Sequence, residues 1–183
     1  MSGPLTALDR PAQQADARLR RWFYGLYLAF GPLALTIFDP PAPRLLWNAS
    51  ASMPRGLYRV HPGTTPRRGD VVVAHLSPAM RDLAAARRYL PAGVPVVKPV
   101  AAVAGDRLCA QRRVIRVNGR HLADRLAVDP AGRALPIWQG CHVLGKGDVF
   151  LLADASPDSF DGRYFGITHR TDLVGTAELL WHR

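Results

Sequence analysis

Residues 96–106 read Val-Val-Lys-Pro-Val-Ala-Ala-Val-Ala-Gly-Asp and place a lysine, Lys98, inside an apolar run of the kind that forms buried β-strands. Burial disfavours the charged form of an amine, so a lysine in a dry β core can be neutral at working pH and accept a proton from a serine hydroxyl. Alternatively, Lys98 extends its ammonium from a strand edge into solvent. Both interpretations stay open on this stretch alone, and the first predicts a Ser/Lys dyad.

Two serines precede the next predicted strand. Residues 48–58 read N-A-S-A-S-M-P-R-G-L-Y, which places Ser50 and Ser52 shortly after the N-terminal apolar run and directly before a run rich in Leu, Tyr and Val. Serine-rich loops are common, so this stretch does not identify a nucleophile by itself. One of these two hydroxyl groups would be the serine of the dyad if the fold brings it next to Lys98.

From residue 44 onward the sequence predicts a mainly β domain with one short soluble helix. Short apolar runs separated by Gly and Pro predict strands within 57–60, 70–75, 94–103, 107–117, 143–153 and 174–181. Asn118-Gly119 is typical of a type I′ hairpin turn. Residues 77–90 predict the helix, with Ser77 as its cap and Pro91 as its stop. Residues 121–142 are expected to form an irregular insertion.

The N-terminal part predicts a membrane anchor. Residues 22–38 carry no charge and would span about 26 Å as a helix, slightly less than a hydrocarbon core. Arginines within residues 1–21 favour a cytoplasmic tail, which leaves 39–47 as a linker and 48–183 as a periplasmic domain at the bacterial inner membrane. Two alternatives are a cleaved signal peptide, whose Ala49-Ser50-Ala51 site lies far downstream, and a buried core helix, which Pro32 disfavours.

The composition and the motifs of the chain argue against several classes of function. The chain has 183 residues, enough for one ordinary domain, and a net charge of +10. Two cysteines and six histidines outside any metal-ligand spacing predict neither a metal site nor a cofactor, and no G-x-S-x-G elbow is present. Arginine pairs could suggest nucleic acid, but without interleaved aromatics we expect anionic lipid headgroups as their partner instead.

Four segments in order resemble the boxes of type I signal peptidases. They are Ser52-Met53-Pro54, Gly69-Asp70-Val71-Val72, Lys98 with Ala104-Gly105-Asp106, and residues 159–166, which read S-F-D-G-R-Y-F-G. The form of the first box, the short chain and the single expected anchor are more similar to the TraF-type branch, conjugative-transfer peptidases that mature a pilin precursor. The resemblance covers residues 46–181 and implies a signal-peptidase-like β fold.

The resemblance also implies roles for particular residues. Ser52 matches the nucleophile and Lys98 the general base, while Ser50 matches the hydroxyl that joins the Ser52 backbone N–H in an oxyanion hole. Ser159 matches the serine that orients the lysine. Asp161 and Arg163 match a carboxylate and a guanidinium that support the site from behind these residues.

The chain departs from the family pattern at two points. Ala153-Asp154-Ala155 stands where signal peptidases usually have Gly-Asp-Asn, and Gly162 replaces a serine, which we expect to loosen the loop of Asp161. The large extra β domain of longer bacterial enzymes is also missing. Neither member of the predicted dyad is affected.

The two cysteines carry a separate prediction. Because a periplasmic domain meets an oxidising compartment, we expect Cys109 and Cys141 to form a disulfide, with two buried free thiols as the alternative. A disulfide that closes this loop of about 33 residues would stabilise the fold by about 3–4 kcal/mol in the chain-entropy model.

These observations predict a membrane-anchored Ser/Lys serine endopeptidase that works on a pilin-like or secreted precursor, without cofactor, metal or nucleic acid. The expected partners are that precursor, membrane lipid and proteins of the conjugative secretion channel. In the TraF-type branch the acyl-enzyme is resolved by the N-terminus of the pilin, which implies cyclisation as a possible second step. The alternatives are a general signal peptidase that removes leader peptides and a catalytically idle assembly factor of the channel.

Overall fold

The computed structural model describes residues 10–38 and 42–182, and the chain divides into two compact units, Met1–Ala42 and Pro43–Arg183. The first unit contains one helix, α1 (Arg10–Phe38), with Pro32 in its interior. It begins well before the predicted start at residue 22. The reason is local, because residues 12–21 are mostly Ala, Gln, Leu and Arg, which are good helix formers.

The helix predicted over residues 22–38 ends where α1 ends, at Phe38, but its predicted start at residue 22 has no counterpart in the structure. The uncharged run belongs to a longer helix that also contains Arg18, Arg20 and Arg21. Within the described residues, none of the helices combines the length and the apolar character that crossing a bilayer requires.

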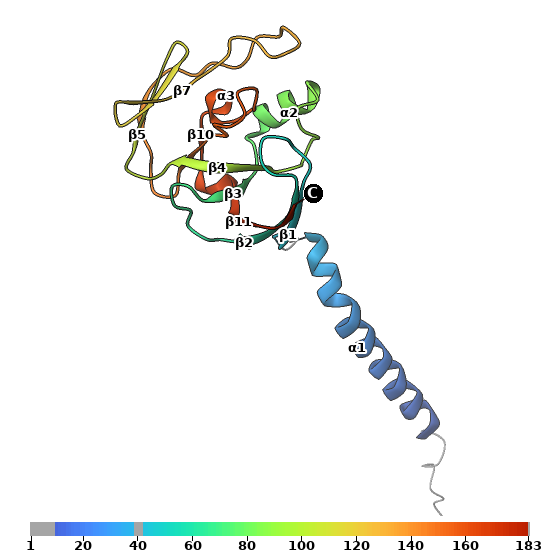
Figure 1. The fold of residues 1–183 in the computed structure, drawn as a ribbon. Coiled ribbons are helices and arrows are strands. Elements are labelled where there is room, and N and C mark those ends of the chain that lie inside the picture. The colour runs from blue at the N-terminus through green and yellow to red at the C-terminus, as the bar shows by residue number, and fades with distance from the viewer. Residues whose placement is uncertain (1–9, 39–41, 183) are drawn as a thin grey trace, which may run out of the picture. The chain divides into compact units, whose positions relative to one another are not determined.

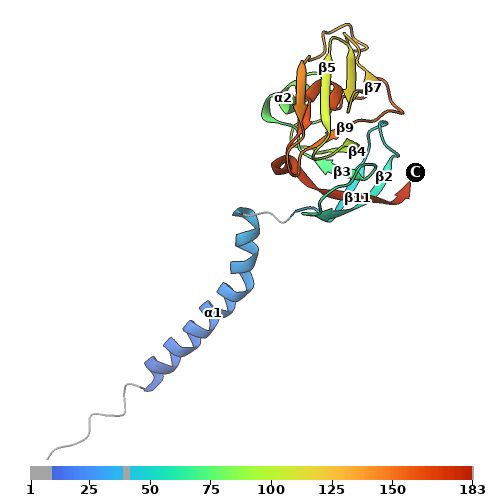
Figure 2. The same cartoon turned by 90° about the vertical axis from the view of Figure 1, so that its left-hand side faces the viewer.

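The second unit is built on an antiparallel sheet of seven strands (Figures 1 and 2). In spatial order its strands are β1 (Leu45–Asn48), β2 (Gly56–Pro62), β11 (Leu173–His182), β3 (Val71–Ala74), β4 (Val96–Ala102), β9 (Val149–Leu151) and β10 (Ile167–Thr168). β4 lies between β3 and β9, and its register places Lys98 opposite Val72. Lys98 is thus carried by an interior strand, which disfavours the strand-edge interpretation.

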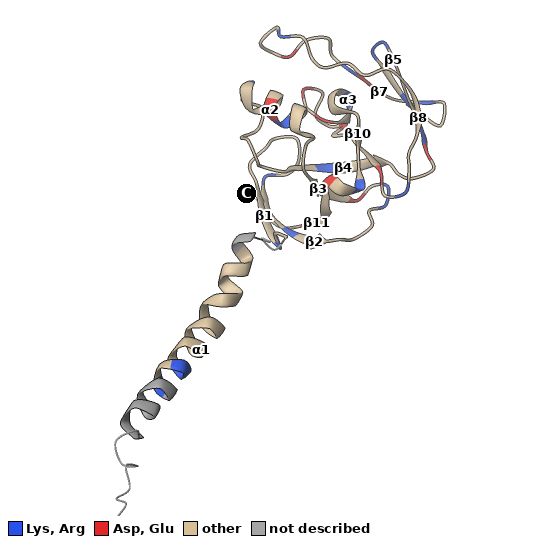
Figure 3. Ribbon diagram, turned by 180° about the vertical axis from the view of Figure 1, so that it is seen from behind, with Lys and Arg blue, Asp and Glu red and all other residues tan. Residues whose placement is uncertain are grey.

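A second sheet has four antiparallel strands in the order β7 (Arg120–Asp124), β6 (Val114–Val117), β5 (Arg107–Gln111) and β8 (Gly140–Val143). A cluster of buried side chains from both sheets packs between them: Ala102, Phe150 and Leu152 with Leu108, Ile115 and Val117. Asn118 and Gly119 both take positive φ, as a type I′ turn between β6 and β7 requires. Basic residues are scattered over this sheet and its turns, in blue in Figure 3.

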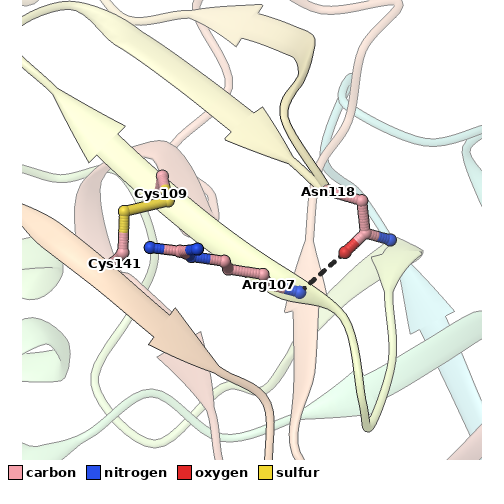
Figure 4. Close-up of a disulfide and its surroundings, with 4 residues drawn as sticks. All are labelled: Arg107, Cys109, Asn118 and Cys141. Carbon is pink, nitrogen blue, oxygen red and sulfur yellow. Dashed lines mark hydrogen bonds between the residues drawn. A yellow bond between two sulfur atoms is a disulfide. The ribbon is translucent and has the colours of Figure 1, made fainter.

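A disulfide joins neighbouring strands of the second sheet (Figure 4). Cys109 on β5 and Cys141 on β8 face each other in register and are bonded. At the N-terminal end of β5, the backbone N–H of Arg107 donates to Oδ1 of Asn118 at 2.8 Å. The disulfide ties the segment after β7 back to the sheet.

The helices of this unit are short. The predicted helix forms as α2 (Pro78–Ala86), but Ser77 makes no capping side-chain hydrogen bond. It ends before Pro91, because Arg88 takes a φ of 59° and leaves the helical conformation. A one-turn helix, α3 (Gly162–Phe165), and a 3-10 turn (Arg170–Asp172) were not predicted.

Several predicted boundaries differ from the structure. β1 begins within the range 39–47 expected to be a linker and ends one residue beyond it, at Asn48. The single strand expected over 107–117 is divided by a turn into β5 and β6, whereas the range 143–153 contains only the last residue of β8 and all of β9. The irregular insertion expected over 121–142 is correspondingly shorter, because β7 and β8 occupy its two ends. β5 and β6 pair as a hairpin, because a turn costs only a few residues and pairs the two halves. β8 pairs with β5 in the second sheet and β9 with β4 in the first, so the chain passes from one sheet to the other between them.

Candidate active site

Lys98 lies in the interior of the domain, with only 4% of its surface exposed. Its Nζ is 2.6 Å from Oγ of Ser52 and 2.5 Å from Oγ of Ser159. The three residues come from distant parts of the chain: the loop after β1, strand β4 and the loop before α3. The fold therefore places one amine between two hydroxyl groups.

The electrostatic surroundings of Lys98 favour its neutral form. Burial lowers the pKa of Lys98 to about 8, because desolvation penalises the ammonium. The charge of Asp161 opposes this shift and the charge of Arg163 adds to it. A substantial fraction of Lys98 is thus unprotonated in mildly alkaline solution, which an exposed lysine would not be.

Ser50 and Ser52 lie in a tight loop, with their Oγ atoms 3.1 Å apart. The buried side chain of Asn48 holds this loop from within. Its Nδ2 donates to the carbonyl oxygens of Ser50, Met53 and Pro54 at 3.1–3.2 Å, and its Oδ1 accepts from the Ser50 N–H. The loop conformation that presents Ser52 to Lys98 is therefore fixed by one carboxamide.

Tyr58 on β2 supports the same loop from the core. Its ring is almost fully buried, and its hydroxyl donates to the carbonyl oxygen of Pro54 at 2.9 Å. Burial raises the pKa of the Tyr58 hydroxyl, which keeps it protonated as a donor. The roles of Asn48 and Tyr58 were not predicted. The available signal was their place within the 48–58 stretch, where an amide and a phenol flank the two serines.

Asp161 and Arg163 form a buried ion pair below Ser159. Arg163 donates through Nε and Nη2 to the two carboxylate oxygens of Asp161, both at 2.9 Å. Asp161 also accepts from the backbone N–H groups of Arg163 and Ala153. Nη2 of Arg163 also donates to the carbonyl oxygens of Ser156 and Ser159, at 2.8 and 3.4 Å. The pair thus holds the backbone that carries Ser159.

The loop of Asp161 is not loosened by Gly162, contrary to expectation. A Cβ atom at Gly162 would lie 2.6 Å from the carbonyl oxygen of Leu151 and from the ring of Phe150. The glycine lets α3 pack directly on β9, and Asp161 has no exposed surface. The replacement of serine by glycine is therefore part of a close backbone contact.

A cleft with a volume of about 690 Å³ opens at these residues. Ser50, Ser52, Lys98 and Ser159 lie in its wall, and most of the rest is apolar, including Leu46, Val94, Val96 and Leu135. Among the described residues, no group of three His, Cys, Asp or Glu side chains is arranged to hold a metal ion. The side chains present offer hydroxyl, amine and amide chemistry next to apolar surface.

Comparison with known proteins assigns a class to this arrangement. A family model described as signal peptidase, peptidase S26, matches residues 19–182. The chain belongs to this family, and its mainly β fold with few helices is the signal-peptidase type. Membership makes it a peptidase, a hydrolase whose substrate is a polypeptide.

Individual proteins with known names are also similar to this chain. Two proteins of Escherichia coli named plasmid transfer protein TraF are similar to the chain, one 32% identical over 136 residues and one 33% identical over 135. Each alignment covers 69% of this chain and 77% or 76% of the relative. A solved signal peptidase I from Enterococcus faecalis is 20% identical, with a TM-score of 0.35 over 62% of this chain and 97% of its own.

Proposed function

We propose that the chain is a Ser/Lys serine endopeptidase that processes a pilin-like precursor for conjugative transfer. The observation that carries this proposal is the position of the Lys98 amine, buried and within hydrogen-bonding distance of both Ser52 and Ser159. The two TraF relatives support the conjugative setting, since their name refers to plasmid transfer. Family membership supports a polypeptide substrate.

In the proposed mechanism, Lys98 in its neutral form takes the proton of Ser52 Oγ as that oxygen attacks the scissile carbonyl carbon. The oxyanion that forms accepts hydrogen bonds from Ser50 Oγ and the Ser52 backbone N–H. When the C–N bond breaks, the ammonium of Lys98 returns the proton to the leaving amine. The substrate acyl group remains esterified to Ser52.

Ser159 acts in this mechanism by orienting the amine. The lone pair of a neutral Lys98 must point at Ser52, so its N–H bonds need other acceptors, and Ser159 Oγ at 2.5 Å supplies one. Asp161 and Arg163 keep Ser159 in place through the backbone contacts described above. Asn48 does the same for the loop of Ser50 and Ser52.

The ester can be resolved in two ways. Water gives a linear product with a new carboxylate, whereas the N-terminal amine of the same substrate gives a cyclic product joined by a new peptide bond. An intramolecular amine held nearby reaches an effective concentration far above that of a free nucleophile. We propose the cyclic route, with hydrolysis as the general signal peptidase alternative.

Intact-mass analysis of a purified pilin precursor after incubation with the full chain separates these routes. Cyclisation predicts a mature product one water lighter than the linear cleavage product. A linear product alone would leave a hydrolase that removes leader peptides. An unprocessed precursor, with the Ser52→Ala variant behaving identically to the native protein, would favour the catalytically idle assembly factor.

We also propose that the protein is attached to the bacterial inner membrane through α1, with the peptidase domain on the periplasmic face. Large apolar side chains of this helix are exposed, among them Trp22, Phe23 and Leu28, and arginines lie on its N-terminal side. Aromatic and basic residues of this kind favour a lipid interface. Protease added to intact spheroplasts should digest the domain, and protection of the domain would contradict this orientation.

A further inference from the structure

The segment between β7 and β8 begins with a small hairpin that the proposed mechanism does not use. Residues 126–135, called here the cleft hairpin, close on themselves through a bridge between Val128 and Ala134. The N–H of Leu135 donates to the carbonyl oxygen of Ala127 at 2.9 Å. In Figure 1 the orange segment after β7 runs above α3 towards α2. A hairpin this short needs further contacts to hold one conformation.

Asp129 provides those contacts inside the cleft hairpin. Its Oδ1 accepts from the N–H groups of Ala131 and Arg133 at 3.0 and 2.8 Å, and its Oδ2 accepts from Nε of Arg133 at 2.7 Å. Only 5% of the Asp129 surface is exposed. The carboxylate therefore acts as the centre on which the tip of the hairpin folds.

The cleft hairpin is also fastened to the segment that follows α2. The hydroxyl of Tyr89 donates to Asp129 Oδ2. Arg87 Nη1 donates to the carbonyl oxygen of Ala134 at 2.8 Å, and the guanidinium of Arg133 lies 5.5 Å from the centre of the Tyr89 ring. These contacts hold the hairpin at a fixed place beside the cleft.

From this place the hairpin presents two leucines to the cleft that also contains Ser52 and Lys98. Leu135 is nearly buried at 8% exposure, whereas Leu126 is 42% exposed and free to meet another molecule. Leu90 and Phe160 add apolar lining. The charged side chains that also line this part of the cleft, Arg87, Asp129 and Arg133, are engaged in the contacts described above. A polypeptide in this part of the cleft would meet Leu126 as exposed apolar surface, next to charged groups that are already paired.

We infer that the cleft hairpin is a specificity wall: Leu126 and Leu135 contact an apolar side chain of the polypeptide being cleaved and select it by size. This inference rests on the proposed peptidase function and adds to it the substrate feature that is read. Size selection of this kind is expected from a wall held in place by Asp129, Tyr89 and Arg87, since a mobile wall would accommodate any side chain.

The test uses the full chain in detergent and a pool of synthetic twelve-residue peptides with each position varied among Ala, Leu and Trp. Mass spectrometry gives relative kcat/KM values for competing peptides in one reaction, a ratio that does not depend on how much enzyme is folded. Leu135→Ala should enlarge the site and raise the Trp-to-Ala ratio at one peptide position about tenfold. Leu126→Trp should narrow the site and shift the same ratio the other way.

Ile137→Ala is the matched control, because Ile137 is an exposed apolar residue outside the cleft lining. It should leave the ratio unchanged. The side chain of Leu126 is exposed enough to be replaced without unfolding the domain. Unchanged Trp-to-Ala ratios in Leu126→Trp would therefore overturn the specificity wall, even if Leu135→Ala proves unstable. Labelling of Ser52 by a small acylating probe separates the specificity wall from the proposed peptidase function. If Ser52 is labelled and the ratios are unaltered, only the specificity wall is rejected. If Ser52 is not labelled and no peptide is cleaved, the proposed function and the specificity wall are both rejected.

Discussion

Nζ of Lys98 lies 2.5 Å from Oγ of Ser159, as close as it lies to the proposed nucleophile. A neutral amine has one lone pair, and a second hydroxyl partner determines the direction in which that lone pair points. Because Ser159 is itself held by the Arg163 contacts to the backbone, the orientation of the amine is set by the loop before α3. Ser159 is thus a positioning residue in the proposed mechanism.

Ser159→Ala should lower kcat about tenfold with KM almost unchanged, since one orienting hydrogen bond to the amine contributes about 1–2 kcal/mol. Steady-state kinetics on a cleaved peptide measures both constants. Rescue by Ser159→Thr, which restores a hydroxyl, is the control. A rise in KM with kcat preserved would show that Ser159 binds substrate instead.

The pH dependence of kcat/KM should follow the deprotonation of Lys98. Its pKa of about 8 predicts activity that falls roughly tenfold per pH unit below 8 and levels off above it, because the neutral amine is the base. A pH series from 6 to 10 on one peptide measures this limb. Activity that is constant from pH 6 to 9 would contradict Lys98 as the base.

Lys98→Met should stabilise the fold while removing activity. The folded pKa of Lys98 lies below its unfolded value of 10.5, so below about pH 8 the residue is protonated in both states and its burial cost is fully present. As pH rises from 8 to 10.5 the unfolded state binds more protons and this cost disappears. Urea unfolding should show a gain of up to about 3 kcal/mol at pH 7 that shrinks towards pH 10. A variant less stable than the native protein at pH 7 would argue against a costly buried amine.

Asp161→Asn should destabilise the fold by about 3–5 kcal/mol, since it leaves the buried guanidinium of Arg163 without its counter-charge. It should also shift the fall of activity below pH 8 to lower pH, because the charge of Asp161 raises the pKa of Lys98. Asp82→Asn is the control, since Asp82 pairs with Arg81 on the surface and should contribute less than about 1 kcal/mol. Equal effects of the two variants in urea unfolding would contradict this role.

The sequence could predict the strand of Lys98 because that feature is local. An apolar run with one lysine indicates a buried strand whatever the rest of the chain does, and β4 forms over 96–102. The roles of Ser52 and Ser159 came from the resemblance, and the fold brings both hydroxyl groups to the same amine. The predicted hairpin at Asn118-Gly119 is local too and is confirmed.

The features that the sequence could not predict depend on distant partners. Tyr89 and Asp129 are 40 positions apart, and neither has a local pattern that indicates the other. The role of Asn48 depends on three carbonyl oxygens that converge only after the loop has folded. The fit of Gly162 against β9 likewise requires the position of a strand eleven residues earlier in the chain, Val149–Leu151. Periodicity contains no information on such contacts.

The central claim, that Lys98 activates Ser52, is tested most directly by the site of covalent labelling. The full chain is treated with a β-lactam-like acylating probe and its peptides are mapped by mass spectrometry. We predict one adduct on Ser52 in the native protein, the same adduct in the exposed control Lys146→Arg, and none in Ser52→Ala or Lys98→Arg, because arginine keeps the charge but cannot act as a base. Normal labelling of Ser52 in Lys98→Arg, or an adduct only on another residue of the native protein, would contradict the account.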